Sequence, residues 1–174
     1  GASAERNSAA NESKLRSGSR LAAGANARRS LTDRIDLFGE VGANWRRAES
    51  AVFEGREFAG RLNLDYSLGP LGTAYLTGEY RRGDTFASGF GNLWNLNNAE
   101  VFVRDDAFEG ADFFAYRFEA RTLLGTLGYN WPLGPRDSLD FSYRRVRTTP
   151  LNATGPGPSS YDVNQYAILY LMRF

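Results

Sequence analysis

The sequence contains no cysteine and no histidine, and Lys14 is its only lysine. Without imidazole or thiol groups there is no serine or cysteine triad of the usual kind, and no zinc or haem site built from those side chains. No apolar run approaches the roughly 18 residues that a spanning helix needs. The sequence therefore predicts no enzyme, no cofactor, no metal site and no helical membrane protein.

An excess of charge of one sign is also missing. The 21 basic residues stand against 20 acidic ones, which leaves a net charge of +1 over 174 residues. A nucleic-acid-binding surface needs a basic excess, so we expect no nucleic-acid partner. The length suits one domain better than two.

What the sequence does have is alternation of apolar and polar residues with a period of two, which is typical of β-strands. Residues 1–15 lack this alternation, so we expect a polar N-terminal tail or loop there. In the fifth alternating segment the apolar parity changes near Thr122, which predicts a β-bulge. The alternation predicts seven strands, at 16–28, 34–46, 58–68, 74–81, 113–131, 138–144 and 161–174.

The connections between these strands alternate between short and long. Short turns, rich in glycine, proline and aspartate, are expected at 29–33, 69–72 and 132–137. Short turns on one rim and long loops on the other are typical of transmembrane β-barrels, in which the long loops are extracellular. The long connections lie at 47–57, 84–112 and 149–160.

Three of the strands end in an aromatic residue followed by two arginines. In each triplet the parity of the strand turns the aromatic ring and the second arginine outward and the first arginine inward. Rings at strand ends, with guanidinium groups beside them, suit a membrane interface that carries lipopolysaccharide phosphates. The outward residues are Trp45, Arg47, Tyr80, Arg82, Tyr143 and Arg145.

The last strand ends on Phe174, and Tyr166, Ile168, Tyr170 and Met172 share its face. This pattern resembles the C-terminal insertion signal of Gram-negative outer-membrane β-barrel proteins, of which Tyr170, Met172 and Phe174 would be the central residues. The sequence departs from the usual signal at two positions, since Leu169 stands for a small residue and Ala167 for a polar one.

The resemblance implies an all-β, antiparallel, up-and-down transmembrane barrel over residues 16–174, located in the bacterial outer membrane. It implies a pore, an export channel or a membrane scaffold for a partner, and contacts with outer-membrane lipid, lipopolysaccharide and the barrel-assembly machinery. Bacterial single-chain barrels have an even number of strands. With seven strands, we expect further strands from another portion or chain; the alternative is an eighth strand hidden in residues 1–14.

The charged side chains of the strands fall on the face opposite the apolar one, where they would line a lumen, because an ion in hydrocarbon costs several kcal/mol. In a narrow barrel these groups pair into a ladder that fills the interior, whereas in a wider barrel they line an aqueous passage. The inward set is Arg16, Arg20, Arg28, Asp36, Glu40, Arg46, Arg61, Asp65, Glu79, Arg81, Arg117, Glu119, Arg121, Asp140 and Arg144.

Two further interpretations concern the longest loop and the fold class. In segment 84–112, Asp105, Asp106, Glu109 and Asp112 gather around a glycine, but their spacing matches no calcium loop, and a solvated acidic loop is the simpler interpretation. Trp94 in the same loop suits docking in the lumen or on a partner. The alternative fold is a soluble or secreted β-sandwich that binds carbohydrate through exposed aromatic rings.

Overall fold

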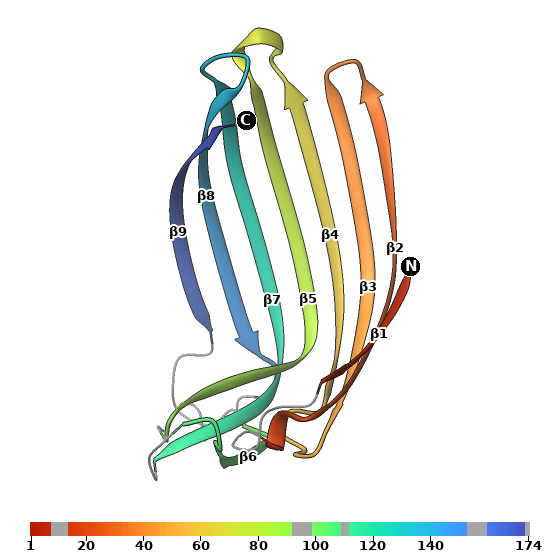
Figure 1. Cartoon of the computed structure of the whole chain (residues 1–174), viewed down its shortest axis with the longest axis vertical. Helices are drawn as coiled ribbons and strands as arrows, with labels where there is room; N and C mark the ends of the chain where they lie inside the picture. Colours follow the sequence, from red (N-terminus) through yellow and green to blue (C-terminus); the bar gives the residue numbers. More distant parts are fainter. Residues whose placement is uncertain (8–13, 92–98, 109–111, 153–159, 173–174) are drawn as a thin grey trace.

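The computed structural model describes residues 1–7, 14–91, 99–108, 112–152 and 160–172, which form one antiparallel sheet (Figure 1). The spatial order is β1-β2-β3-β4-β5-β7-β8-β9, and β6 pairs with β7. The described residues also form two 3-10 helices, η1 (Lys14–Arg16) and η2 (Gly69–Leu71), and no helix among them is long and apolar enough to cross a membrane. The strands are β1 (Ala2–Asn7), β2 (Gly18–Thr32), β3 (Ile35–Ala48), β4 (Gly55–Ser67), β5 (Thr73–Phe90), β6 (Val101–Arg104), β7 (Phe113–Pro132), β8 (Asp137–Pro150) and β9 (Tyr161–Met172).

The expected all-β, antiparallel, up-and-down architecture is confirmed, but the sheet is not closed into a barrel. In the part of the chain that the structure describes, β9 pairs only with β8. At the other side of the sheet, β1 pairs with the first part of β2, from Gly18 to Ala23. Both sides of the sheet therefore present strand edges without a partner among the described residues.

Two strands lie where we expected loops. β1 lies in the segment expected to be a polar tail, at the place of the alternative eighth strand, and β6 lies in the longest loop. The main strands also continue beyond the residues that alternate in polarity. β5, for example, was expected at 74–81 and reaches Phe90. Backbone hydrogen bonds to a neighbouring strand continue where small residues give no alternation of polarity, so the sequence pattern underestimates strand length.

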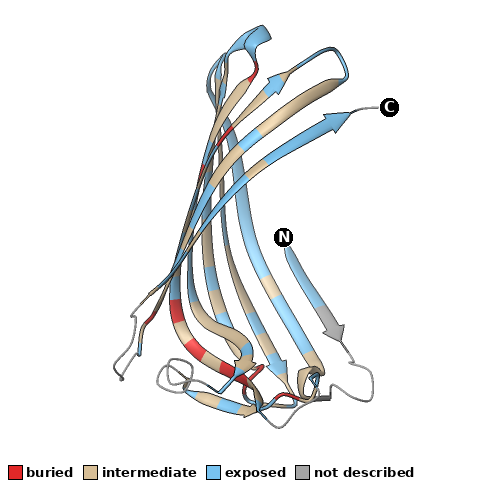
Figure 2. Cartoon of the chain, turned by 90° about the vertical axis from the view of Figure 1, so that its left-hand side faces the viewer, coloured by how far each residue is buried: buried red, intermediate tan, exposed pale blue. Residues whose placement is uncertain are grey.

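The two faces of the sheet differ in polarity and in curvature. Figure 2 shows that the sheet curves into a trough. Thr77 is 6% exposed, whereas Leu76 beside it, which points to the other face, is 53% exposed. The polar side chains thus occupy the concave face. The convex face carries large side chains that remain well exposed, among them Val41, Trp45, Phe58, Leu62, Leu76, Tyr80, Leu123, Leu127, Trp131, Phe141, Tyr166, Ile168, Tyr170 and Met172.

Buried apolar residues are few, and they gather at one end of the trough. We call this end, which carries the connections after β3, β5 and β8, the loop end, and the opposite one the turn end. Val52, Phe53 and Ala115 form a small cluster there, and Leu15, Ala48, Phe86, Val101 and Val103 pack against it. The wall of the sheet has no comparable core in its described residues.

β5 bends sharply near the loop end (Figure 1), and Gly83 in the loop-end half of this strand has φ +144°. A Cβ atom at this position would overlap the backbone carbonyl oxygen of Arg56 on β4. Beyond the bend, β5 and the start of β7 leave the wall and curve with β6 across the loop end (Figures 1 and 2). We call residues 84–91, 99–108 and 112–119 the cap.

The predicted β-bulge near Thr122 is wrong. β7 pairs with β5 without a register shift, so Thr122 lies opposite Arg81 and Arg117 lies opposite Phe86. The apolar parity changes because β7 passes from the cap into the wall. In the cap Tyr116 and Phe118 are buried on one face, whereas in the wall the apolar residues occupy the other.

Replacing Gly83 with alanine tests the bend. We expect G83A to lower the free energy of unfolding by about 1–3 kcal/mol, since the residue must leave a conformation that only glycine adopts readily. The measurement is the denaturant midpoint of the folded protein. Gly78 on the same strand is the control, because its Cβ would meet nothing within 4 Å. Equal midpoints for G83A and G78A would contradict the role of the bend.

Candidate functional site on the concave face

Acidic and basic side chains alternate across the middle of the concave face. Arg61 on β4 lies directly opposite Glu40 on β3 and Glu79 on β5. Glu79 in turn forms an ion pair with Arg81 on its own strand. Because neighbouring strands are about 4.8 Å apart, the middle of the trough carries opposite charges in close succession and little net charge.

A tyrosine joins two strands that are not neighbours. The Tyr75 hydroxyl on β5 donates a hydrogen bond to Asp140 Oδ1 on β8, at 2.8 Å. β7 lies between them, and the tyrosine ring crosses it at Gly128, where a Cβ would overlap the ring. This glycine is therefore required for the contact that ties β5 to β8 across the concave face.

Further polar contacts line the turn end of the trough. Asn63 Nδ2 donates to Asp65 Oδ1 at 2.8 Å, and Thr77 Oγ1 donates to Asn63 Oδ1 at 2.5 Å. Arg28 forms an ion pair with Asp36 at 2.8 Å. Most polar groups of this region thus have a partner within the wall, which stabilises the polar face without a covering layer.

At the loop end, the cap and the wall enclose a polar pocket of about 280 Å³. The Arg46 guanidinium lies over the Phe86 ring, with Cζ 5.0 Å from the ring centre, and Arg20 Nε donates to Asn44 Oδ1 at 2.8 Å. The pocket is lined by four arginines and two acids together with small and aromatic residues: Arg20, Asn44, Arg46, Gly55, Arg56, Glu57, Arg81, Asp84, Thr85 and Phe86.

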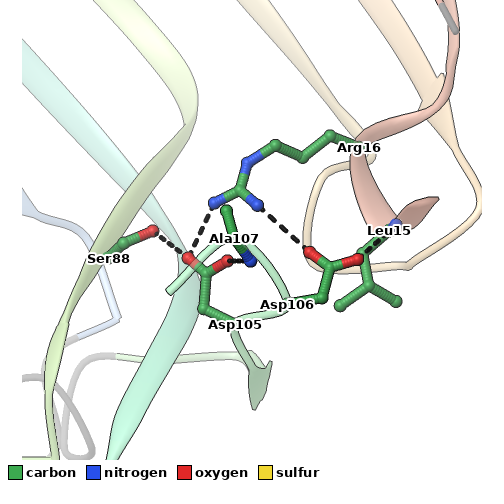
Figure 3. Close-up of polar contacts among 6 residues, drawn as sticks. All are labelled: Leu15, Arg16, Ser88, Asp105, Asp106 and Ala107. Carbon is green, nitrogen blue, oxygen red and sulfur yellow. Dashed lines mark hydrogen bonds and ion pairs between the residues drawn. The ribbon is translucent and has the colours of Figure 1, made fainter. Parts of the chain in front are cut away.

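The cap is attached to the far side of the trough by one polar cluster, which we call the latch (Figure 3). Arg16 in η1 binds two successive carboxylates that follow β6. Its Nη2 lies 2.7 Å from Asp105 Oδ2 and its Nη1 lies 3.2 Å from Asp106 Oδ1. The backbone N–H of Leu15 donates to Asp106 Oδ2 at 3.0 Å. The latch therefore joins segments about ninety residues apart in the sequence.

Asp105 is the most enclosed charged group of the latch, at 1% exposure. Its Oδ2 also accepts the Ser88 hydroxyl at 2.6 Å, and its Oδ1 accepts the Ala107 N–H at 3.0 Å. Burial raises the pKa of the Asp105 carboxyl, but the hydrogen bonds from Arg16, Ser88 and Ala107 and the charge of Arg16 outweigh it. The net pKa lies below the ordinary value for aspartate, so Asp105 is ionised at neutral pH.

Most residues expected to face a lumen lie on the concave face. The pairing of the strands places them on the same side of the sheet as Thr77, whose burial identifies the concave face. Arg16 is the exception among the early residues, because it lies in η1 and belongs to the latch. The concave set is Arg20, Arg28, Asp36, Glu40, Arg46, Arg61, Asp65, Glu79, Arg81, Asp140 and Arg144.

Arg117, Glu119 and Arg121 do not belong to this set, which corrects our assignment from the sequence. Arg121 lies directly opposite Arg82, and Glu119 forms an ion pair with Arg82 at 3.6 Å, on the convex side. Arg117 lies in the cap and donates to the backbone carbonyls of Ala51 and Glu54. The assignment failed because it depended on the β-bulge that the structure does not contain.

The outward members of the three aromatic-arginine triplets lie on the convex face. Arg82 pairs with Glu119, as described, and Arg145 lies 3.6 Å from Asp162. The Tyr143 ring packs against Tyr166 of β9, with ring centres 5.1 Å apart. Trp45, Arg47, Tyr80, Arg82, Tyr143 and Arg145 thus share the side that carries the exposed apolar residues.

The C-terminal strand carries apolar residues on both faces. Tyr170 and Met172 lie on the convex face, opposite Leu139 and Asp137, whereas Leu169 and Leu171 lie on the concave side, opposite Asp140 and Ser138. Phe174, the last residue of the expected insertion signal, lies outside the described residues. So do Trp94 and Glu109 of the longest loop.

The described residues contain no group of three or more acids that converges on a possible metal site. Asp105 and Asp106, which we considered as calcium ligands, bind Arg16 instead. Neither this contact nor the one between Tyr75 and Asp140 could be predicted from the sequence, because both depend on which strands the fold brings together. The phase change in β7 was the one available signal of the cap.

Comparisons with protein-family models, with curated proteins and with solved structures find no significant match. What the protein does must therefore be inferred from the faces of the sheet, the cap and the latch.

The lowered pKa of Asp105 predicts a specific dependence on pH. Its carboxylate contributes fully to stability above the ordinary aspartate pKa of about 4, and the contribution is lost as the pH falls through the lower folded value. We expect D105N to lower the free energy of unfolding by about 1.5–3 kcal/mol at pH 7. The difference from the unmodified protein should shrink below about pH 4.

The measurement is the denaturant midpoint of both proteins between pH 7 and pH 3. Asp112 in the cap is the control position, because it is exposed. D112N should follow the unmodified protein at every pH. A D105N difference that does not change with pH would contradict the ionised latch.

Proposed function

We propose that this chain forms part of the wall of an outer-membrane β-barrel. Its convex face contacts lipid and its concave face lines an aqueous lumen. In this proposal the protein has no catalytic activity and acts as a pore, an export channel or a membrane scaffold for a partner.

The observation that carries this proposal is the inverted polarity of the sheet. Leu62, Leu76 and Leu127 lie near the middle of the convex face, and each is more than half exposed. Soluble monomers rarely expose an apolar surface that extends over so many strands. In a bilayer the same surface contacts acyl chains instead of water, so its exposure carries no hydrophobic cost. The concave face keeps its charges in water.

Strand length supports the same proposal. A tilted strand needs about 9–11 residues to cross the hydrocarbon layer. β3 has 14 residues, β4 has 13, β8 has 14 and β9 has 12. β5 and β7 are longer, with 18 and 20 residues, and their additional length lies in the cap.

The open edges support the expectation of further strands. Unpaired backbone N–H and C=O groups are costly in lipid, so a membrane-embedded sheet must close on itself or on other strands. The edge of β9 and the part of β2 beyond Gly24 are the places where such strands would pair. We infer that another portion or another chain supplies them, and that the barrel-assembly machinery inserts the product.

The aromatic-arginine triplets support a lipopolysaccharide contact at the loop end. Their rings and their outer guanidinium groups share the convex face. Arg47 has no acidic partner among the described residues, and Arg82 and Arg145 hold theirs at 3.6 Å. Guanidinium groups so placed are free to bind lipid phosphates in a bidentate manner.

The carbohydrate-binding β-sandwich has less support. A sandwich needs a second sheet packed on the apolar face of the first. The described residues form one sheet, and nothing among them covers its convex face.

An arginine placed on either face tests the proposal. Leu127 and Leu124 lie on the same strand but face opposite sides, and Leu124 lies directly opposite Glu79. We expect L127R to lower the free energy of unfolding in lipid or detergent by about 2–4 kcal/mol. L124R should change it by less than about 1 kcal/mol, because its guanidinium faces water and an acid.

The measurement is reversible unfolding of the protein folded into lipid or detergent, together with extraction from cell envelopes. If the protein dissolves without detergent, or if L127R is as stable as L124R, the convex face does not contact lipid and the proposal fails.

A further inference from the structure

We propose that the cap is a hinged closure of the loop end, which bends at Gly83 and is held shut by the latch of Arg16, Asp105 and Asp106. This inference rests on the proposed function, since it names what controls passage along the trough.

The position of the cap is the first argument. Figure 2 shows the buried start of β7 curving beneath the concave side, toward the end of the trough where η1 lies. Asp84, Thr85 and Phe86 of the cap line the same pocket as Arg20 and Arg46 of the wall, so the cap covers polar wall residues directly. Any solute moving along the concave face at this end meets the cap.

The second argument is that the two sides of the cap are attached differently. On the β5 and β7 side it continues the wall through backbone pairing, for example between Gly83 and Ala120. On the η1 side, the tip after β6 is attached through Arg16 and the Leu15 N–H. One side is therefore a hinge built of backbone, and the other is a small set of hydrogen bonds to two carboxylates.

The third argument concerns the cost of opening. The apolar cluster beneath the cap has three buried members, Val52, Phe53 and Ala115. So small a cluster leaves the attachment of the cap dependent on polar contacts as well. The latch adds charge-assisted hydrogen bonds to a carboxylate that is 1% exposed. These are among the stronger polar contacts in proteins, so the latch holds the tip of the cap. Arg117 and Asp84 hold the base of the cap to Glu54 and Arg56.

Arg16 also contacts the cluster itself. Its Cζ lies 4.5 Å from the centre of the Phe53 ring in the connection between β3 and β4. One guanidinium thus joins η1, the β3–β4 connection and the tip of the cap. Loss of this single side chain should remove the guanidinium contacts with both neighbours at once and leave only the Leu15 N–H on Asp106.

Two variants of Arg16 test the inference in the complete membrane-inserted protein, together with any chain that accompanies it. The first measurement is amide hydrogen exchange in the cap, at residues 84–91 and 99–108. We expect R16Q to increase exchange there by about ten- to a hundredfold, with no change in the wall. R16K keeps the charge but loses the planar fork, so it should fall between R16Q and the unmodified protein.

The second measurement is conductance in planar lipid bilayers. We expect R16Q to conduct more than the unmodified protein, with R16K intermediate. The control for the exchange measurement is R28Q, which breaks the exposed ion pair with Asp36 at the turn end, far from the cap. R28Q should leave cap exchange unchanged.

The outcomes separate the inference from the proposed function. Unchanged cap exchange in R16Q would show that the latch does not hold the cap. Faster exchange with unchanged conductance would show that the cap does not close the passage. Either result overturns the inference. Failure of the proposed function would appear independently, as a protein that needs no detergent and tolerates L127R. In that case the exchange measurement would still test whether the latch holds the cap.

Discussion

The backbone hydrogen-bond ladder holds this protein together, because the sheet has almost no core to do so. From β2 to β9 each long strand pairs with its neighbours over a dozen residues or so, but among the described residues only the cap, at the loop end, covers any part of the wall. The apolar side chains that would form a core in a soluble protein lie outside, and the polar side chains lie within the curve. An exposed apolar surface of this extent is unfavourable in water, and the proposal of a lipid contact follows from this constraint.

The same constraint explains where the protein does form a packed interior. At the loop end, β5 and β7 extend beyond the length that a membrane requires and bend at Gly83 across the end of the trough. There they leave the surroundings of the wall, and the polarity of β7 reverses, so that Tyr116 and Phe118 become buried while Arg117 binds the β3–β4 connection. Cap and wall are thus parts of one sheet, but the apolar side chains lie on the inner face of the cap and on the outer face of the wall.

The sequence predicted the strands of the wall and the sides to which their residues point, because a period of two determines the face of every residue once one is known. It failed at β7, where we attributed the reversed polarity to a bulge and therefore placed Arg117, Glu119 and Arg121 on the wrong face. The alternation shows only that the apolar residues move to the other parity along the strand. A bulge and a passage from cap to wall both produce this shift. The latch and the contact between Tyr75 and Asp140 were out of reach for another reason. Their partners are distant in the sequence, and only the order of the strands brings them together.

The composition of the latch has a consequence for the order in which the protein assembles. Arg16 precedes β2, Phe53 lies between β3 and β4, and Asp105 follows β6, so these residues meet only after the intervening strands are side by side. Contacts between such distant segments form late, because the chain must first lose the freedom of every loop between them. The strands of the wall therefore pair before the latch forms. A newly made molecule passes through a stage in which the cap is not yet attached to η1.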